Sequence, residues 1–194
     1  MLRGQRRSGL QPGQSVMVIG SGISGLLHVH LAHAARAGRV IATDISEYRL
    51  RAAQRLGADA TIHAGEDVPA RLRAINSGRL ADLVIICTGA TEAIAQGLRS
   101  VERGGTVLFF AAANRGAVIP LSINDLFWRT EITLTSSYAG SPADYAEALE
   151  LIRKRTVQVG EMITHRLSLS EAGLGFQLVA TAQDSIKVVI QPQR

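Results

Sequence analysis

Three glycines near the start of the sequence have the spacing of a loop that binds phosphate groups. The loop Gly20-Ser21-Gly22-Ile23-Ser24-Gly25 directly follows the apolar run 16–19 and precedes a segment rich in leucine and alanine. In a strand–turn–helix unit of this kind, the first glycine permits the tight turn and the second lets the backbone approach a pyrophosphate. The third lets helix and strand pack closely. The free N–H groups and positive dipole end of the helix would then face the phosphates.

One acidic residue follows this loop at an informative distance. Asp44 closes the next apolar run, 39–44, near the roughly 20 positions after the loop at which a ribose anchor is expected. A carboxylate there accepts hydrogen bonds from ribose hydroxyls and repels a 2′-phosphate, so the pattern predicts NAD, with NADP less favoured. Arg49, in the following helix, could cover the adenine or pair with Asp44, which leaves some room for NADP. The alternative, a glycine turn without a ligand, would make the position of Asp44 a coincidence.

Strand-like and helix-like segments alternate around these residues, as in a series of βαβ units. The expected strands are 16–19, 39–44, 60–63, 83–87 and 106–110, and the expected helices are 25–37, 47–56, 67–75 and 91–98. This alternation predicts an α/β fold of the Rossmann type, a doubly wound parallel sheet with helices on both faces. The pair Gly104-Gly105 is expected to form a turn before the fifth strand.

The pattern changes beyond residue 110. We expect strands at 118–121 and 131–137 around a short helix at 123–128, then a helix over 141–155, an extended segment at 163–169, a helix capped by Ser170 and a last strand at 187–190. Ser141-Pro142-Ala143-Asp144 is a typical helix start. We therefore divide the sequence into a lead-in (1–12), an NAD-binding Rossmann domain (13–160) and a C-terminal segment (161–194).

Composition excludes several classes of function. Aromatic residues make up 4% of the sequence and the net charge of +5 is spread along it, whereas a nucleic-acid surface needs a basic stripe with stacking aromatics. No apolar run approaches the roughly 20 residues that cross a membrane, and no secretory signal follows the first arginines. The single cysteine, Cys87, lies in an apolar run, so we expect a buried thiol and a cytoplasmic location.

As a set, these motifs resemble those of the medium-chain alcohol dehydrogenases, most of all the zinc-dependent branch that includes sorbitol and threonine dehydrogenases. The resemblance covers nearly the whole chain from about Gly9. It is carried by Pro12-Gly13-Gln14-Ser15-Val16, the glycine loop, Asp44 with Arg49, Leu56-Gly57-Ala58-Asp59, Cys87-Thr88-Gly89-Ala90, Ser141-Pro142-Ala143-Asp144-Tyr145, Ile163-Thr164-His165-Arg166-Leu167 and Lys187-Val188-Val189-Ile190. It implies the C-terminal, cofactor-binding half of an enzyme that transfers hydride between NAD and an alcohol.

The resemblance also implies further cofactor contacts. These would come from Thr88 and Gly89 on the adenosine side, from Phe110 and Ala111 near the nicotinamide ribose, from Ser136, Ser137 and Tyr138 near the nicotinamide, and from Lys187 at the pyrophosphate. For Lys187, a solvated charge at a strand end is an equally good interpretation. Ser24 departs from the aliphatic residue that the family usually has there, which should weaken packing slightly without preventing binding.

In the family, the chemistry is carried by a GroES-like N-terminal domain that holds the catalytic zinc, and the last segment of the chain returns to that domain. This sequence contains no second cysteine. We therefore expect no catalytic residue and no metal ligand here, zinc only in the missing half, and no activity of the chain alone. His30 and His33 could share a helix face but have no third ligand beside them.

Three functions compete at this point. The favoured one is the NAD-binding portion of an alcohol or polyol dehydrogenase. The second is a stand-alone NAD(H)-binding sensor or regulatory module without turnover, and the third is an S-adenosylmethionine methyltransferase, which the three-glycine spacing disfavours. The expected partners are NAD(H), a zinc-bearing domain and a second copy of the chain, which the resemblance implies is bound through the sheet edge at 118–121 and 132–136. Neither nucleic acid nor membrane is expected.

Overall fold

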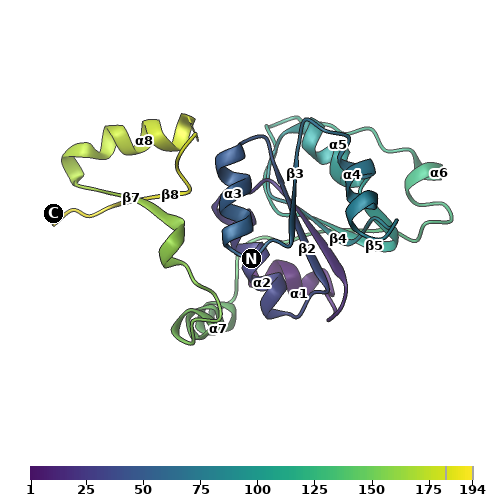
Figure 1. Cartoon of the computed structure of the whole chain (residues 1–194), viewed down its shortest axis with the longest axis horizontal. Helices are drawn as coiled ribbons and strands as arrows, with labels where there is room; N and C mark the ends of the chain where they lie inside the picture. Colours follow the sequence, from purple (N-terminus) through teal and green to yellow (C-terminus); the bar gives the residue numbers. More distant parts are fainter. Residues whose placement is uncertain (182, 194) are drawn as a thin grey trace.

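A six-stranded parallel sheet in the order β3-β2-β1-β4-β5-β6 forms the centre of the molecule (Figure 1). The computed structural model describes residues 1–181 and 183–193. The strands are β1 (Ser15–Ile19), β2 (Arg39–Asp44), β3 (Ala60–His63), β4 (Ala81–Ile86), β5 (Val101–Phe109) and β6 (Thr133–Ser136), and the helices between the first five are α2 (Ile23–Ala34), α3 (Glu47–Arg55), α4 (Val68–Ile75) and α5 (Thr91–Leu98). This strand order is that of the Rossmann fold, so the predicted fold class is confirmed.

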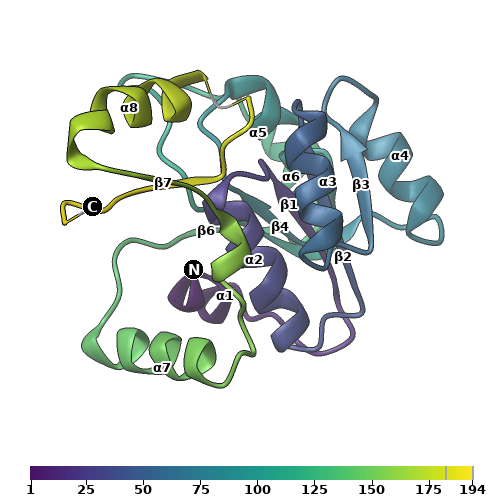
Figure 2. The same cartoon turned by 60° about the vertical axis from the view of Figure 1, so that its left-hand side comes forward.

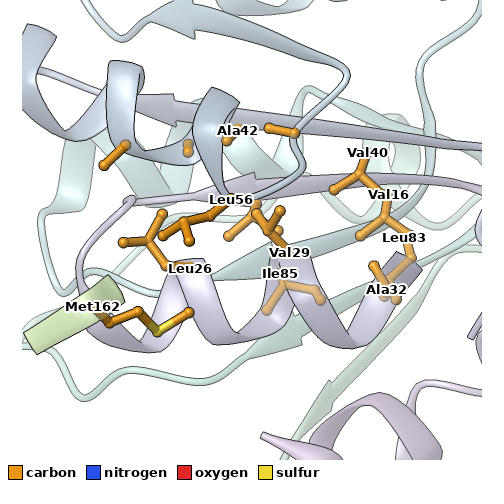
Figure 3. Packing of buried hydrophobic residues seen from close by; sticks show 14 of the residues in the cluster. Val16, Leu26, Val29, Ala32, Val40, Ala42, Leu56, Leu83, Ile85 and Met162 are labelled. Atoms are coloured by element: carbon orange, nitrogen blue, oxygen red, sulfur yellow. The ribbon is translucent and has the colours of Figure 1, made fainter. Parts of the chain in front are cut away.

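β1 is buried along its whole length because helices cover both faces of the sheet. Val16 and Val18 of β1 pack with α2 and α3 in one cluster of buried side chains (Figure 3), whereas Met17 and Ile19 pack with α4 and α5 in the other. Successive side chains of a strand point to opposite faces, so a strand buried on both sides needs a continuous apolar run rather than an alternating one. Each large side chain buried in this way contributes about 1.5–3 kcal/mol to folding.

The prediction of a turn at Gly104-Gly105 is wrong. β5 begins at Val101 and runs through both glycines, with an irregularity in its pairing to β4 between Ala81 and Leu83. Gly104 has a φ of +73°, and its N–H donates to the carbonyl of Thr130 at 2.7 Å. A glycine in this conformation bends a strand at a bulge without ending it.

The prediction of a strand at 118–121 is also wrong. This segment has no regular secondary structure, and the side chain of Val118 is 80% exposed. After it come α6 (Ile123–Leu126) and the edge strand β6. A strand exists only when a neighbour accepts and donates its hydrogen bonds, and no second strand borders this segment within the described residues of one chain.

The lead-in contains a helix that the sequence did not predict. α1 (Leu2–Arg7) packs on α2 and on α7 (Pro142–Arg153). Arg6 forms ion pairs with Asp144 and Glu147 of α7. Gln5 is buried and donates to the carbonyl of His28 at 2.8 Å. Six residues that include three arginines show too little apolar periodicity for a sequence prediction, so the contacts with α2 and α7 determine this helix.

The C-terminal elements form a small unit beside the sheet (Figures 1 and 2). They are the 3₁₀ turns η1 (Gly160–Met162) and η2 (Leu169–Glu171), the parallel strand pair β7 (Ile163–Leu167) and β8 (Lys187–Ile190), and α8 (Ala172–Thr181). Met162 anchors the unit, because its buried side chain joins the cluster around Leu26 (Figure 3). The cap of the last helical segment is Ser168, in a capping box with Glu171, and not the predicted Ser170.

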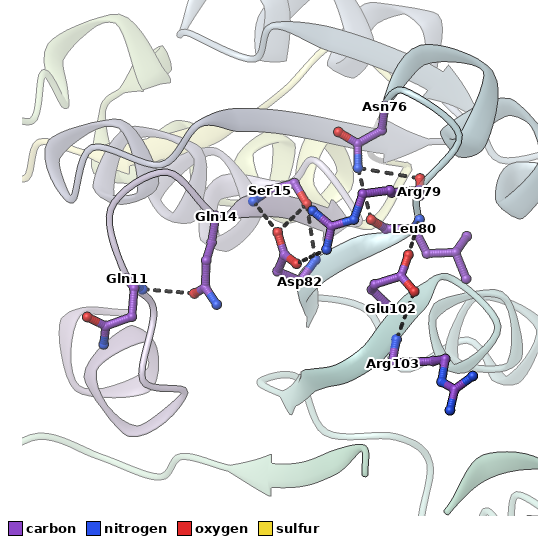
Figure 4. A network of polar contacts seen from close by, with 9 residues as sticks. All are labelled: Gln11, Gln14, Ser15, Asn76, Arg79, Leu80, Asp82, Glu102 and Arg103. Atoms are coloured by element: carbon purple, nitrogen blue, oxygen red, sulfur yellow. Dashed lines mark hydrogen bonds and ion pairs between the residues drawn. The ribbon is translucent and has the colours of Figure 1, made fainter. Parts of the chain in front are cut away.

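Carboxylates fix the amino ends of the central strands (Figure 4). Asp82 accepts hydrogen bonds from both the N–H and the hydroxyl of Ser15 at 2.8 Å and from Arg79 at 2.8 Å. Glu102 accepts from the N–H of Leu80 at 2.9 Å. Although burial opposes ionisation, the hydrogen bonds from Ser15 hold the pKa of Asp82 below its usual value. This polar network lies at one edge of the sheet and leaves the carboxyl ends of the strands at the other.

Candidate functional site

The carboxyl ends of β1, β2, β4 and β5 meet at one edge of the sheet. The strand order reverses between β1 and β4, which are neighbours although they are distant in sequence. The connection from β1 runs to α2 on one face and that from β4 to α5 on the other. Such a switch point leaves a crevice outside the strand ends where ligands of open α/β sheets bind. Asp44 is the last residue of β2, and the loop 20–25, Thr88, Gly89 and Ala111 follow strands that end here.

The three glycines of the loop have three different geometries. Gly20 has a φ of +89°, and a Cβ there would lie 3.3 Å from the carbonyl of Cys87. A Cβ on Gly25 would lie 1.9 Å from the carbonyl oxygen of Gly20, so helix and loop touch backbone to backbone. Gly22 is open: among the described residues, chain neighbours aside, the atom nearest to a Cβ there belongs to the Arg49 guanidinium, at 4.0 Å. Gly20 thus forms the turn, Gly25 allows the close packing, and Gly22 leaves the open approach that a pyrophosphate requires.

The helix after the loop begins two residues earlier than predicted. α2 spans Ile23–Ala34 instead of 25–37, and Gly22 is its N-cap, with no side chain capping the first turn. Ile23 and Ser24 therefore belong to the first helical turn, where backbone N–H groups lack partners inside the helix. Their amides point out of the helix end, where an anion is stabilised.

Asp44 is nearly buried, with 6% of its surface exposed, and both of its carboxylate oxygens are in use. Oδ2 accepts from the N–H of Ser21 at 2.8 Å, and Oδ1 accepts from the N–H of Ser46 at 2.9 Å. Each carboxylate oxygen can accept a further hydrogen bond, so both remain competent toward ribose hydroxyls. Sequence reasoning missed the part played by Ser21 and Ser46 because these bonds come from backbone groups.

Arg49 lies against the carboxylate and the glycine loop. Its Nη1 is 3.9 Å from Oδ2 of Asp44, which is the pairing considered from the sequence. Its Nε is buried and finds no hydrogen-bond partner in the described part of the chain. The guanidinium thus lies beside the Asp44 carboxylate and the glycine loop, with donors to spare.

The loops after β4 and β5 touch each other. A Cβ on Gly89 would lie 2.4 Å from the carbonyl oxygen of Ala112, so no larger residue fits without backbone movement. The N–H of Ala111 donates to the carbonyl of Ile86 at 3.1 Å. Ser137 and Tyr138 line a cavity of about 420 Å³ together with Phe110. Neighbouring Ser136 uses its carbonyl to accept from Arg7.

The described residues show no contact between Lys187 and the glycine loop 20–25. It lies on β8, where its carbonyl accepts from the hydroxyl of Thr164 at 3.3 Å. No hydrogen bond or ion pair joins its ammonium group to residues 20–25 within the described ranges. Its assignment to the pyrophosphate stays a prediction.

The side chains present do not fit a zinc site. Residues 1–181 and 183–193 contain no group of three or more His, Cys, Asp and Glu side chains that could hold a metal ion. Burial raises the pKa of Cys87 to about 12, so this thiol is protonated at neutral pH and is a poor ligand.

None of the described helices is both long and apolar enough to span a membrane.

Comparison with known proteins gives consistent similarities. Residues 24–154 match the family model described as "Zinc-binding dehydrogenase". The chain is 34% identical over 182 residues to an L-threonine 3-dehydrogenase of Bacillus subtilis, covering 93% of this chain and 52% of the relative. It is 28% identical over 189 residues to a sorbitol dehydrogenase of Mus musculus, covering 96% and 52%.

Two solved structures with the same fold are 29% and 28% identical to this chain in sequence. One is a putative zinc-binding dehydrogenase from Sinorhizobium meliloti bound to NADP, with a TM-score of 0.88 and 29% identity, covering 98% of this chain and 56% of that one. The other is the alcohol dehydrogenase TADH from Thermus sp. ATN1, with a TM-score of 0.86 and 28% identity, covering 95% and 53%. The chain spans about half the length of the curated relatives it matches.

Proposed function

The chain belongs to the zinc-binding dehydrogenase family, and from this premise we propose that it is the NAD-binding portion of an alcohol or polyol dehydrogenase. The observation that carries the proposal is the glycine loop, where Gly22 is open to a ligand and Asp44 is hydrogen-bonded to the adjacent Ser21 amide. When bound, NAD supplies the hydride acceptor or donor. Residues 13–160 would form its domain.

In this proposal the chain binds and orients the nucleotide. The first turn of α2 holds the pyrophosphate and Asp44 accepts hydrogen bonds from the ribose hydroxyls. The remaining contacts are Thr88 and Gly89 on the adenosine side, Phe110 and Ala111 near the nicotinamide ribose, Ser136, Ser137 and Tyr138 near the nicotinamide, and Lys187 at the pyrophosphate. Asp44 favours NAD, while Arg49 is the group that would receive the 2′-phosphate of NADP.

The zinc ligands would come from a partner domain, without which the chain would lack activity. The surface that supports this part of the proposal is α8, where Leu174, Phe176 and Val179 are exposed and Phe176 reaches 79%. Apolar side chains gathered on one helix typically mark an interaction site. Residues 161–194 would return to that domain, and the proposed location is cytoplasmic.

Nucleotide titration tests the cofactor assignment. We expect NADH to bind saturably, as followed by its fluorescence, and NADPH to bind more weakly. Asp44→Ala should weaken NADH binding about tenfold or more, because a hydrogen bond to a charged group contributes about 1.5–3 kcal/mol. The same variant should reduce the preference of the chain for NADH over NADPH, because Arg49 loses its carboxylate partner.

The control for Asp44→Ala is Glu47→Ala, which removes an exposed carboxylate from the first turn of α3. Equal loss in both variants would point to net charge instead of a ribose contact. Thermal unfolding of each variant separates lost binding from lost structure, since Asp44 also bonds two backbone amides. Failure of the wild-type chain to bind either nucleotide would contradict the proposal.

We further propose that two copies associate through the edge formed by β6 and segment 118–121. Val118, Ile123 and Trp128 are exposed there, and the neighbouring residues Ile119 and Leu121 border a groove of about 650 Å³ at the amino ends of β4 and β5. A second copy could give segment 118–121 the strand neighbour that it lacks.

This association predicts a dimer by light scattering at micromolar concentration. Val118→Asp should shift the population toward monomer by at least about tenfold in dissociation constant, because it places a charge in an apolar contact. Leu174→Asp, on α8, is the matched control and should leave the dimer intact. A wild-type chain that is monomeric at every concentration would refute this edge as an interface.

A further inference from the structure

We propose that His63 is a positioning residue that fixes the turn after Asp44 and so shapes the adenine end of the nucleotide site. The inference rests on the proposed NAD site and adds to it a residue that neither the glycine motif nor the family resemblance indicates. His63 ends β3 and stands directly opposite Asp44 of β2 in the sheet register. The two residues therefore reach the same edge of the sheet together.

The imidazole of His63 bridges two backbone groups. Its Nε2 is 3.0 Å from the carbonyl oxygen of Ile45, and its Nδ1 lies 3.1 Å from the N–H of Gly65. A carbonyl only accepts and an N–H only donates, so the partners require a neutral ring with the proton on Nε2. In this state both ring nitrogens are satisfied, and the ring ties the turn after β2 to the turn after β3.

The backbone at His63 and Ala64 is itself held by further hydrogen bonds. The N–H of Ala64 donates to the carbonyl of Asp44 at 2.9 Å, and the side-chain amide of Gln96 on α5 donates to the carbonyl of Ala64 at 2.9 Å. The N–H of His63 donates to Glu66 at 3.3 Å, and Glu66 pairs with Arg71 of α4 at 2.9 Å. His63 thus connects the end of β2, through hydrogen bonds and an ion pair, to residues of α4 and α5.

The residue fixed in this way is Ile45, whose side chain is 78% exposed. Ile45 lies between Asp44, which would hold the ribose, and Ser46, whose N–H holds Oδ1 of that carboxylate. The pyrophosphate and the base are attached at different carbons of the ribose, so with the pyrophosphate on α2 and the ribose on Asp44 the adenine would extend beyond Asp44, toward Ile45. A turn whose backbone is fixed before binding would present the Ile45 side chain to the base at a lower entropic cost than a mobile turn.

Binding of NADH and of ADP-ribose by His63 variants tests this inference. His63→Ala should weaken both ligands by the same factor, about 5- to 10-fold, because the lost contact concerns only the adenosine part that they share. The fluorescence of bound NADH at saturation should stay unchanged, since the nicotinamide end is untouched. His63→Gln, whose amide can still donate to the carbonyl of Ile45, should recover part of the affinity.

His33→Ala is the matched control, because the ring of His33 also bonds a backbone carbonyl, that of Gly57, but far from the strand ends of the site. We expect similar loss of thermal stability in both variants and loss of affinity only in His63→Ala. Wild-type binding with an unchanged dissociation constant in His63→Ala would overturn this inference alone, as would an equal loss in His33→Ala. A wild-type chain that binds neither NADH nor ADP-ribose would overturn the proposed function and this inference with it.

Discussion

Gly25→Ala is expected to destabilise the domain severely, whereas Gly22→Ala is expected to leave it folded and to weaken nucleotide binding at least about tenfold. A Cβ on Gly25 would lie 1.9 Å from the carbonyl oxygen of Gly20 and 3.2 Å from Cγ1 of Val18, so the loop or α2 must move. Forcing extra volume into a packed site costs about 3 kcal/mol, which lowers the melting temperature of a domain of this size by roughly 10 °C.

Gly22 presents the opposite situation. Its φ of −70° suits any residue, and among the described residues, chain neighbours aside, the atom nearest to an added methyl group is Nη1 of Arg49, at 4.0 Å. We therefore expect Gly22→Ala to change stability by less than about 0.5 kcal/mol. The methyl group would nevertheless occupy the open approach to the loop, where the pyrophosphate must touch the backbone.

Thermal melting and NADH titration of both variants separate the two roles. The expected result is a large fall in melting temperature for Gly25→Ala, and a normal melting temperature with at least tenfold weaker NADH binding for Gly22→Ala. Normal binding by Gly22→Ala would show that the ligand does not approach this face of the loop. An unchanged melting temperature in Gly25→Ala would contradict the close backbone packing.

The parts of the site that the sequence predicts are those in which one residue meets a local demand. Gly20 is needed for a positive φ and Gly25 for the absence of a Cβ, and such demands leave a signature in residue type and spacing. Asp44 is recognisable for the same reason, because it closes a strand at a fixed distance from the loop.

The parts that the sequence does not predict depend on neighbours from elsewhere in the chain or beyond it. The bridge from His63 involves the carbonyl of Ile45, in the turn after another strand, and its only sequence signal is a histidine at a strand end. Segment 118–121 has the composition of a strand, yet strand formation also requires a neighbouring strand. α1 is a helix because α2 and α7 pack on it, and its own six residues say little.

Acid is expected to destabilise the domain through one buried histidine, His28. Its side chain is fully buried, and its ring packs edge-on against Phe110 with centroids 4.5 Å apart. Gln5 offers an amide N–H to Nδ1 at 3.2 Å, so the ring proton resides on Nε2, which is buried without a partner in the part of the chain that is described. Burial, aided by the positive amino terminus, lowers the pKa of His28 to about 3.

The sign of the effect follows from the two states. An unfolded histidine has a pKa of about 6.5, so below that pH the unfolded chain binds a proton that the folded chain refuses. Titration of His28 therefore leaves the free energy of unfolding nearly unchanged above pH 6.5. As the pH falls from 6.5 toward 3, it lowers the free energy of unfolding by up to about 1.4 kcal/mol per pH unit. Between pH 6.5 and pH 5 this amounts to about 2 kcal/mol.

Urea unfolding of the wild type and His28→Leu at pH 7.5 and pH 5 measures this contribution. Leucine has no proton to bind and fills an apolar site, while Gln5 keeps its 2.8 Å hydrogen bond to the backbone carbonyl of residue 28. At pH 7.5 the two proteins should differ by about 1 kcal/mol or less, because the variant loses the hydrogen bond to Nδ1 and the ring contact with Phe110 but also removes the buried Nε2 that has no partner among the described residues. At pH 5 the free energy of unfolding of the variant, relative to that of the wild type, should be about 2 kcal/mol higher than at pH 7.5. Equal pH dependence in both proteins would mean that the folded state accommodates a charged His28, and hence that water reaches the contact between α1, α2 and Phe110.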